Sequence, residues 1–197
     1  MVELFYKNYV LDIPKDVYYP SDDTYLLLNT LEKELKNKKF KSSLEIGTGN
    51  GLLSLSIYDQ VTDLTLVDIN INVIHHIIGI KKKYNLNKIN IIQSNLFEKI
   101  SKKYDLIIFN PPYVPSESFD DLTTDGGKEG SEIIFKFLNK LYDFLEDNGV
   151  CYLLISSLNN KNKIFKKIKE NNLEYKILNS KRIFFEDLIT LKIKKTR

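Results

Sequence analysis

The motif Asn110-Pro111-Pro112-Tyr113, directly after an apolar run, is the part of the sequence best suited to chemistry. Two consecutive prolines hold the backbone extended and supply no N–H donors, which leaves carbonyl oxygens free to accept hydrogen bonds. The Asn110 side chain adds an acceptor, and Tyr113 adds an aromatic wall. These groups suit a planar amino group attached to a π system, such as a side-chain amide or an exocyclic base amine. The alternative is a rigid turn, which is the more frequent role of an isolated Asn-Pro pair.

A glycine-rich turn, Glu45-Ile46-Gly47-Thr48-Gly49-Asn50-Gly51, lies between a candidate strand and a candidate helix. Glycines let the backbone turn sharply and let a ligand approach its N–H groups. Leu52 stands where a dinucleotide-binding fingerprint has its third glycine, and the sequence contains no Walker-type Gly-Lys-Ser/Thr. The turn therefore disfavours NAD, FAD and ATP hydrolysis, and it suits a nucleoside ligand without a pyrophosphate. Taken alone, it is equally compatible with a plain tight turn.

Polar residues follow successive candidate strands. Asp68 ends the second strand, where such folds place the carboxylate that accepts hydrogen bonds from ribose hydroxyls. Asn95 follows the third strand and Asn110 the fourth, although Asn95 by itself is typical of a turn. Open α/β sheets bind ligands at the carboxyl ends of their strands. We therefore expect these residues and the glycine turn to line one pocket.

The elements that must position this pocket alternate between short β-branched runs and helical patterns, which is typical of a parallel α/β sheet. The sequence predicts strands at Leu44–Ile46, Leu64–Val67, Ile89–Gln93, Leu106–Phe109 and Val150–Ser156, then an antiparallel pair at Leu173–Leu178 and Ile183–Ile193. It also predicts five helices. The first is capped by Ser21, the second spans about Gly51–Gln60, and the third has Ile74, Ile77 and Ile78 on one face. The fourth has an apolar stripe from Ile134 to Leu145 and ends at Gly149 as its C-cap, and the fifth spans Lys161–Lys169.

Composition limits the class of protein. The chain has 197 residues, 43% of them hydrophobic and 28% charged, which indicates a soluble globular protein of one domain. Its longest charge-free stretches, Ile46–Tyr58 and Asn148–Asn160, are too short to cross a bilayer as helices. The first residues lack a signal-peptide layout, so the expected location is the cytoplasm. Cys151 is the single cysteine, which excludes an internal disulfide and an all-cysteine metal site. A net charge of +3 with interspersed signs leaves nucleic-acid binding open.

The chain contains no alanine and is rich in Lys, Ile and Asn, as an A+T-rich genome would produce, so its lysine runs carry little functional weight. We interpret Lys161–Lys169 as the solvated face of a helix rather than an RNA contact, with Ile164, Phe165 and Ile168 turned inward. The adjacent His75 and His76 lack the i,i+4 spacing of metal ligands, and we interpret them as packing or surface residues. No metal is expected.

Together, these residues resemble the class I S-adenosylmethionine-dependent methyltransferases, specifically the short HemK-like glutamine methyltransferases that modify class I translation release factors. The resemblance covers nearly the whole chain. Its motifs are Tyr18-Tyr19-Pro20-Ser21-Asp22-Asp23-Thr24, the Glu45–Gly51 turn, Asp68 followed by Asn70, the Asn110–Tyr113 motif, and Gly126-Gly127-Lys128-Glu129-Gly130. It implies a Rossmann-like α/β fold, with a mostly parallel seven-stranded sheet, a C-terminal antiparallel hairpin and helices on both faces. The domain would span residues 1–197, with residues 1–20 as an N-terminal extension.

The resemblance also implies the ligands. S-adenosyl-L-methionine would be the cofactor, with Thr24, Glu45 and Gly47 at its methionine end, Asp68 at the ribose and Asn95 at the adenine. Gly49, Leu96 and Asn110 are the other expected cofactor-binding residues. The family commonly has Asp at position 95. Asn110, Pro111 and Tyr113 would be the catalytic residues that hold the target amide. Adenine-N6 and other nucleobase methyltransferases share this motif, and a protein lysine is a further possible target. A protein substrate is favoured because little sequence remains outside the core for gripping a flipped base.

Two further expectations concern surfaces. The resemblance implies a small zinc-binding activator protein as partner, and the third strand, Ile89–Gln93, offers an edge with little charge and no proline for strand addition. The loop Pro115–Gly130 has no periodic pattern and carries Glu117, Asp120, Asp121 and Asp125. We expect it to be mobile without substrate and to order over a bound peptide.

Overall fold

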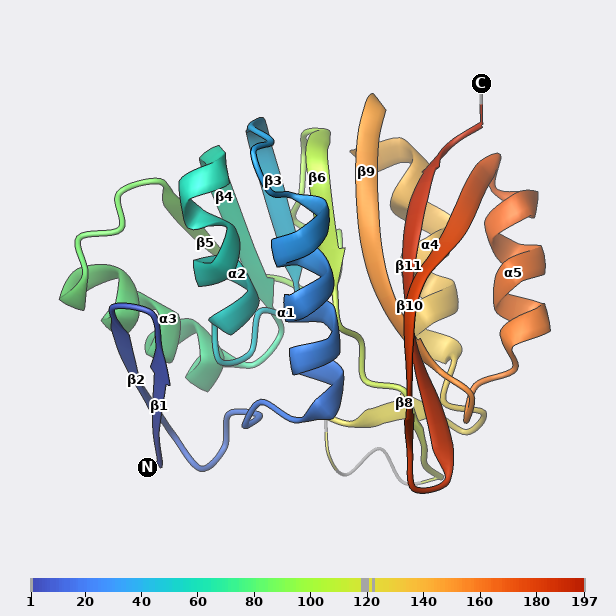
Figure 1. The fold of residues 1–197 in the computed structure, drawn as a ribbon, viewed down its shortest axis with the longest axis horizontal. Coiled ribbons are helices and arrows are strands. Elements are labelled where there is room, and N and C mark those ends of the chain that lie inside the picture. Colours follow the sequence, from blue (N-terminus) through green and yellow to red (C-terminus); the bar gives the residue numbers. More distant parts are fainter. Residues whose placement is uncertain (1, 118–120, 122, 197) are drawn as a thin grey trace.

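The computed structural model of the chain describes residues 2–117, 121 and 123–196, and its centre is a seven-stranded sheet (Figure 1). Strand order across the sheet is β10-β11-β9-β6-β3-β4-β5. Strands β3, β4, β5, β6 and β9 are parallel, and β11 runs antiparallel to both of its neighbours. The strands are β3 (Phe40–Ile46), β4 (Val61–Asp68), β5 (Ile89–Gln93), β6 (Tyr104–Phe109), β9 (Leu145–Ser156), β10 (Leu173–Ile183) and β11 (Glu186–Lys195). The predicted fold class is confirmed, including β5 at a sheet edge.

Helices cover both faces of the sheet, with α1 in front of it and α4 behind it in Figure 1. The helices are α1 (Asp22–Glu34), α2 (Leu52–Ile57) with a 3₁₀ turn at Tyr58–Gln60, α3 (Ile71–Lys83), α4 (Glu132–Phe144) and α5 (Lys161–Glu170). Alternate residues of β6 enter different cores: Leu106 and Ile108 pack with α1–α3, whereas Ile107 and Phe109 pack with α4 and α5. Successive residues of a strand point to opposite faces of the sheet, so a strand covered by helices on both faces needs apolar residues at every position.

The N-terminal extension forms a hairpin that was not predicted. Within the part of the chain that the structure describes, strands β1 (Val2–Tyr6) and β2 (Tyr9–Ile13) pair only with each other. Leu4 and Leu11 are buried in the core that contains α1–α3, and the Tyr84 hydroxyl accepts from the Val10 N–H at 2.7 Å. The hairpin is therefore packed against the outer side of α3, and it is stabilised by tertiary contacts rather than by the main sheet.

One predicted helix end is wrong, and one predicted N-cap is in place without a side-chain hydrogen bond. Gly149 does not cap α4, because the helix ends at Phe144 and Gly149 lies inside β9. Leu145 already has extended dihedral angles (φ −89°, ψ 135°) and pairs with Tyr104 of β6, so sheet pairing ends this helix. Ser21 occupies the N-cap position of α1, but its side chain makes no capping hydrogen bond. Its backbone oxygen accepts from Tyr25 N–H at 3.0 Å instead.

Of the other expectations outside the pocket, those for the lysine-rich helix and the histidines agree with the structure, and two details of strand and helix limits differ. Ile164 and Ile168 are fully buried, so the lysines of α5 lie on a solvated face. His75 is exposed, and His76 is half-buried with Nε2 3.3 Å from the Asn50 carbonyl oxygen, where burial lowers its pKa. Ile183 ends β10 instead of beginning β11, and Ile80 rather than Ile78 completes the buried face of α3. Over residues 2–117, 121 and 123–196, no helix is long and apolar enough to cross a membrane.

Candidate active site

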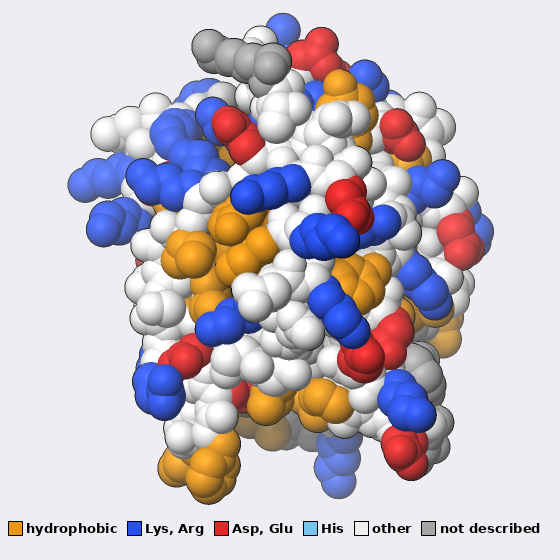
Figure 2. All heavy atoms as spheres, turned by 90° about the vertical axis from the view of Figure 1, so that its right-hand side faces the viewer, with side chains coloured by type: hydrophobic (Ala, Val, Ile, Leu, Met, Phe, Trp, Pro, Cys, Tyr) orange, Lys and Arg blue, Asp and Glu red, His pale blue; other side chains and the backbone are white. Residues whose placement is uncertain are grey.

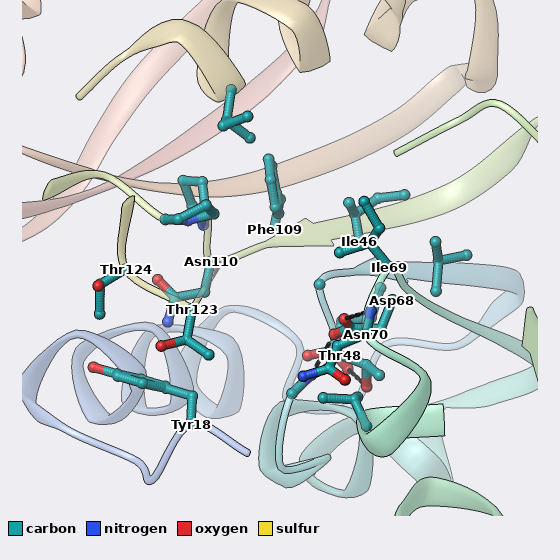
Figure 3. Close-up of a pocket in the computed structure, with 18 of the residues that line it drawn as sticks. Tyr18, Ile46, Thr48, Asp68, Ile69, Asn70, Phe109, Asn110, Thr123 and Thr124 are labelled. Atoms are coloured by element: carbon teal, nitrogen blue, oxygen red, sulfur yellow. Dashed lines mark hydrogen bonds between the residues drawn. The ribbon is translucent and has the colours of Figure 1, made fainter. Parts of the chain in front are cut away.

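A cavity of about 300 Å³ lies at the carboxyl ends of β3, β4, β5 and β6. Figure 3 shows Tyr18, Asn110 and Thr123 grouped at one end, and Thr48, Asp68 and Asn70 at the other. The structure brings all of the predicted site residues to this lining: Thr24, Glu45, Gly47, Gly49, Asp68, Asn95, Leu96, Asn110, Pro111 and Tyr113. The strand-edge argument therefore predicted the position of the pocket correctly.

The glycine turn lies directly against the end of β4. Gly47 has φ +63° and Gly49 has φ +50°, a region that disfavours other residue types. The Gly49 N–H donates to Asp68 Oδ2 at 3.1 Å, and the Asn70 N–H donates to Oδ1 at 2.9 Å. Both oxygens of Asp68 thus accept from the backbone, and the Ile69 N–H also interacts with this carboxylate. Burial raises the pKa of Asp68, and these N–H groups act in the opposite direction. The carboxylate is fixed in place with lone pairs left for further donors.

Glu45 is buried beneath the same turn and is 1% exposed. Its Oε2 accepts from Thr48 Oγ1 at 3.3 Å and from Ser54 Oγ. Burial raises the pKa of Glu45 well above its usual range, and the negative charge of Asp68 adds to that shift. A positive charge on a ligand would lower the pKa again. An ionised Glu45 would attract a cation at this end of the cavity.

Asn95 and Leu96 form the outer rim of the pocket. The Asn95 Nδ2 group donates to Glu98 Oε1 at 2.8 Å. This bond orients the amide so that Oδ1 is left to accept, and no described residue donates to it. Leu96 has φ +48°, an unusual backbone conformation for leucine. The rim therefore presents one amide oxygen, which is an acceptor suited to an amino group.

At the opposite end of the pocket, Asp23 orients the Asn110 side chain. Asp23 is 4% exposed, and its Oδ2 accepts from Asn110 Nδ2 at 3.1 Å. Its Oδ1 accepts from the Tyr18 hydroxyl at 3.1 Å and from the Thr24 N–H at 2.6 Å. An ionised carboxylate only accepts hydrogen bonds, so the Asn110 amide must turn its NH₂ group toward Asp23. Asn110 Oδ1 is consequently directed away, and this buried oxygen has no partner among the described residues.

A segment of the N-terminal extension forms one wall of the pocket. Asn50 Nδ2 donates to the Tyr18 carbonyl oxygen at 2.9 Å, and Asn70 Nδ2 donates to the Asp16 carbonyl oxygen at 3.3 Å. Burial raises the pKa of the Tyr18 hydroxyl, and the nearby Asp23 carboxylate adds to that shift. Tyr18 therefore stays protonated and donates to Asp23. The sequence argument did not assign Tyr18 or Asp23, although both lie in the motif before Thr24.

The loop after the Asn-Pro-Pro-Tyr motif is attached to it by close backbone contacts. Short strands β7 (Val114–Pro115) and β8 (Asp125–Gly127) pair in parallel, a feature that was not predicted. Asn159 Nδ2 donates to the carbonyl oxygens of Tyr113 at 2.8 Å and of Gly130 at 2.9 Å. A Cβ atom at Gly130 would lie 2.4 Å from the Tyr113 oxygen, so only glycine fits. Asn159 was missed because no local pattern marks it, and Asp120 lies outside the described residues.

The fold and the pocket together define a class I methyltransferase. The chain belongs to the methyltransferase small domain family, whose model matches residues 21–184, and within it to the HemK-like methyltransferases. It is 34% identical over 190 residues to a Methanocaldococcus jannaschii protein named as a protein N5-glutamine methyltransferase, covering 92% of this chain and 93% of that protein. It is 30% identical over 199 residues to human methyltransferase HEMK2, covering 92% and 91%.

A solved structure shows the same similarity. A chain of the E. cuniculi Mtq2–Trm112 complex, which is described as responsible for methylation of the eRF1 translation termination factor, matches with a TM-score of 0.73. The two chains are 28% identical, and the match covers 92% of this chain and 99% of that chain. The predicted family and enzyme class are therefore confirmed.

Proposed function

We propose that this enzyme transfers a methyl group from S-adenosyl-L-methionine to the side-chain amide nitrogen of a glutamine in a class I translation release factor. The observation that carries the proposal is the buried Asn110 Oδ1, an acceptor that Asp23 directs away from itself and that has no partner among the described residues. A primary amide has two N–H donors to satisfy such acceptors. The relatives named for glutamine and for a termination factor support the same substrate.

The residues of the pocket fit the proposed cofactor. Asp68 would accept from the ribose hydroxyls, because both of its oxygens are fixed at the pocket and remain able to accept. Asn95 Oδ1 would accept from the adenine amino group, with Leu96 beside it. Thr24, Glu45, Gly47 and Gly49 would surround the methionine end, where an ionised Glu45 would attract the positive charge of the cofactor. When bound, S-adenosyl-L-methionine supplies an electrophilic methyl group on a positively charged sulfur.

Asn110, Pro111 and Tyr113 would hold the target amide. An amide nitrogen is a weak nucleophile because its lone pair is delocalised into the carbonyl group. Asn110 Oδ1 can accept one N–H of the amide, and no described residue donates to the Pro111 carbonyl oxygen, which leaves it for the other. Both bonds strengthen as positive charge develops on nitrogen, so these acceptors would stabilise the transition state more than the bound amide. Alignment supplies the rest of the acceleration.

Tyr113 would act as a wall and not as a base. Burial raises the pKa of its hydroxyl, and the carboxylates of Asp23 and Glu186 add to that shift. The hydroxyl therefore stays protonated at neutral pH. A methylated amide nitrogen loses its extra proton readily to water, so the site needs no strong base. Asp23 is a positioning residue in this scheme, since it acts through Asn110.

The substrate is tested by offering purified release factor, ribosomal or transfer RNA, and duplex DNA in parallel, with methyl transfer to each followed by mass spectrometry. We expect transfer to one glutamine of the release factor, and Asn110→Ala should reduce that transfer by about a hundredfold or more. Transfer to a nucleobase or to a lysine in place of glutamine would contradict the proposal.

We further propose that a small zinc-binding activator pairs with the β5 edge. Hydrogen bonds from Leu64 N–H to Lys88 O and from Ser94 N–H to Asp68 O show which side of β5 faces β4. By the alternation of a strand, the backbone groups of Ile91 and Gln93 face outward, where an added strand could pair with them. Ile91→Lys should abolish co-purification with the activator, whereas Ile177→Lys, on the opposite edge strand, should not. Equal recovery of the complex from both variants would refute this interface.

The family model matches residues 21–184, and the β1–β2 hairpin packs into the same core as α1–α3, so we propose a single methyltransferase domain over residues 1–197. The segment around Asp16 and Tyr18 then belongs to the pocket of that domain. A cooperative, single unfolding transition by calorimetry would agree with one domain.

A further inference from the structure

The turn that joins β10 to β11 exposes two phenylalanines. Ile183 pairs with Glu186, so Phe184 and Phe185 form a two-residue hairpin loop. Their exposed fractions are 94% and 97%, the highest among the large hydrophobic residues of the described chain. Phe184 also has φ +30°. A loop of this length favours Asn-Gly or Asp-Gly, because its backbone requires positive φ. Both the backbone and the side chains of this turn are therefore unfavourable in the isolated fold.

The turn lies at the same end of the sheet as the pocket. Leu188 pairs with Ser156 at the carboxyl end of β9, and the Glu186 side chain accepts from Ser156 Oγ. Lys181 Nζ lies 2.7 Å from Asp22 Oδ1, at the start of the helix that carries Asp23 into the pocket. Figure 1 shows the hairpin extending past the sheet at this end, and Figure 2 shows hydrophobic side chains projecting at the lower end of the molecule.

The base of the turn is held rigidly. Arg182 forms an ion pair with Asp187, with Nη2 3.1 Å from Oδ2. The Asp187 N–H donates to Ser157 Oγ at 2.8 Å, and the Ser157 N–H donates to the Asp187 carbonyl oxygen at 2.9 Å. These bonds hold the backbone at the base of the turn and so fix where the loop lies relative to the pocket. Phenylalanine has only two side-chain torsions, so its immobilisation on binding costs little conformational entropy.

We propose that Phe184 and Phe185 dock into an apolar depression on the protein that carries the target glutamine, beside the methylated residue. This inference rests on the proposed function. A folded protein that inserts a glutamine side chain into the pocket lies over its mouth, at the end of the sheet where the hairpin tip projects. Burial of two aromatic rings supplies binding energy away from the reacting atoms, so the contact should lower KM without changing the chemical step.

The test replaces the loop by Phe184→Asn with Phe185→Gly, which gives the turn the residues that its backbone favours and so protects the fold. We expect KM for whole release factor to rise about tenfold or more, with kcat, cofactor affinity and turnover of a short glutamine peptide unchanged. Phe5→Ser is the matched control, because Phe5 is 72% exposed in β1 of the N-terminal hairpin and should leave every value unchanged.

The outcomes separate the two proposals. If the parent chain methylates release factor and the loop variant does so with the same KM, the docking inference is wrong and the proposed function stands. An equal loss on the short peptide would show that the turn supports the pocket and not docking. Loss of a dimer in sedimentation with unchanged KM would assign the rings to self-association instead. If the parent chain modifies nucleic acid and not release factor, both proposals fall.

Discussion

The role of the hydrogen bond between Asp23 and Asn110 can be tested by exchanging which of the two side chains donates and which accepts. In Asp23→Asn, the new Oδ1 retains the donors Tyr18 OH and Thr24 N–H, so the new NH₂ group faces Asn110 at the position of the present 3.1 Å contact. Two facing NH₂ groups repel, and Asn110 must rotate by about half a turn to accept. Its own NH₂ group then enters the pocket, where a target amide needs an acceptor.

The magnitude follows from the loss of one transition-state acceptor. Removing a single preorganised hydrogen-bonding group from an active site costs about 2.7–4 kcal/mol, or roughly 10²–10³ in kcat. We therefore expect Asp23→Asn to lower kcat by that factor. Asn110→Asp should also be inactive, because it places a second carboxylate about 3 Å from Asp23. The two carboxylates then either repel each other or share a proton, and the side chain at position 110 loses its orientation.

The double variant Asp23→Asn with Asn110→Asp should recover activity to within roughly tenfold of the parent chain. The NH₂ group introduced at position 23 can donate to one oxygen of the new carboxylate, and the other oxygen is presented to the pocket as an acceptor. The assay is single-turnover methyl transfer, with cofactor affinity measured by calorimetry as the control for each variant. A double variant no more active than the weaker single variant would refute the orientation of Asn110 by Asp23.

Three further predictions follow from the site and its surroundings. Asp68→Ala removes charge-assisted acceptors and should weaken cofactor binding by about 1.5–3 kcal/mol, and unchanged affinity by calorimetry would contradict the ribose assignment. The pKa of Glu45 is raised on folding, so the folded chain retains a proton that the unfolded chain releases, and stability should fall as pH rises above the usual range for glutamate. Glu45→Gln should flatten that slope in thermal unfolding above about pH 4.5, and an identical slope would be inconsistent with a buried carboxyl whose pKa is raised on folding. Gly126→Ala would set a Cβ atom 2.3 Å from the Gly130 oxygen and should lower the free energy of unfolding by about 1–3 kcal/mol. The Cβ atom of Gly79→Ala in α3 meets nothing within 4 Å, so this variant should raise the free energy of unfolding by about 0.5–1 kcal/mol. Equal denaturation midpoints for the two variants would contradict both predictions.

The parts of the fold that the sequence predicted are those in which a local pattern and the tertiary structure agree. The glycine turn, Asp68 and the parallel strands all have short-range signals, and each was found. The prediction that Gly149 ends α4 was wrong because Leu145 fits a helical stripe and a strand equally well. Only the pairing of Leu145 with Tyr104 decides between the two. Asp23 was not assigned because its bond to Asn110 joins residues 87 positions apart, which no local period records.

The place of β11 in the sheet affects how the chain is made. Although β11 follows all the other strands in sequence, it lies between β10 and β9, so the sheet stays divided while the ribosome has yet to synthesise residues 186–195. Until then β9 is an open edge, and its fully buried residues Cys151–Ile155 have only one neighbouring strand. Such edges are prone to pair with other chains. Nascent chains and truncations that stop before Glu186 should therefore aggregate, whereas loss of the β1–β2 hairpin would leave the main sheet fully paired.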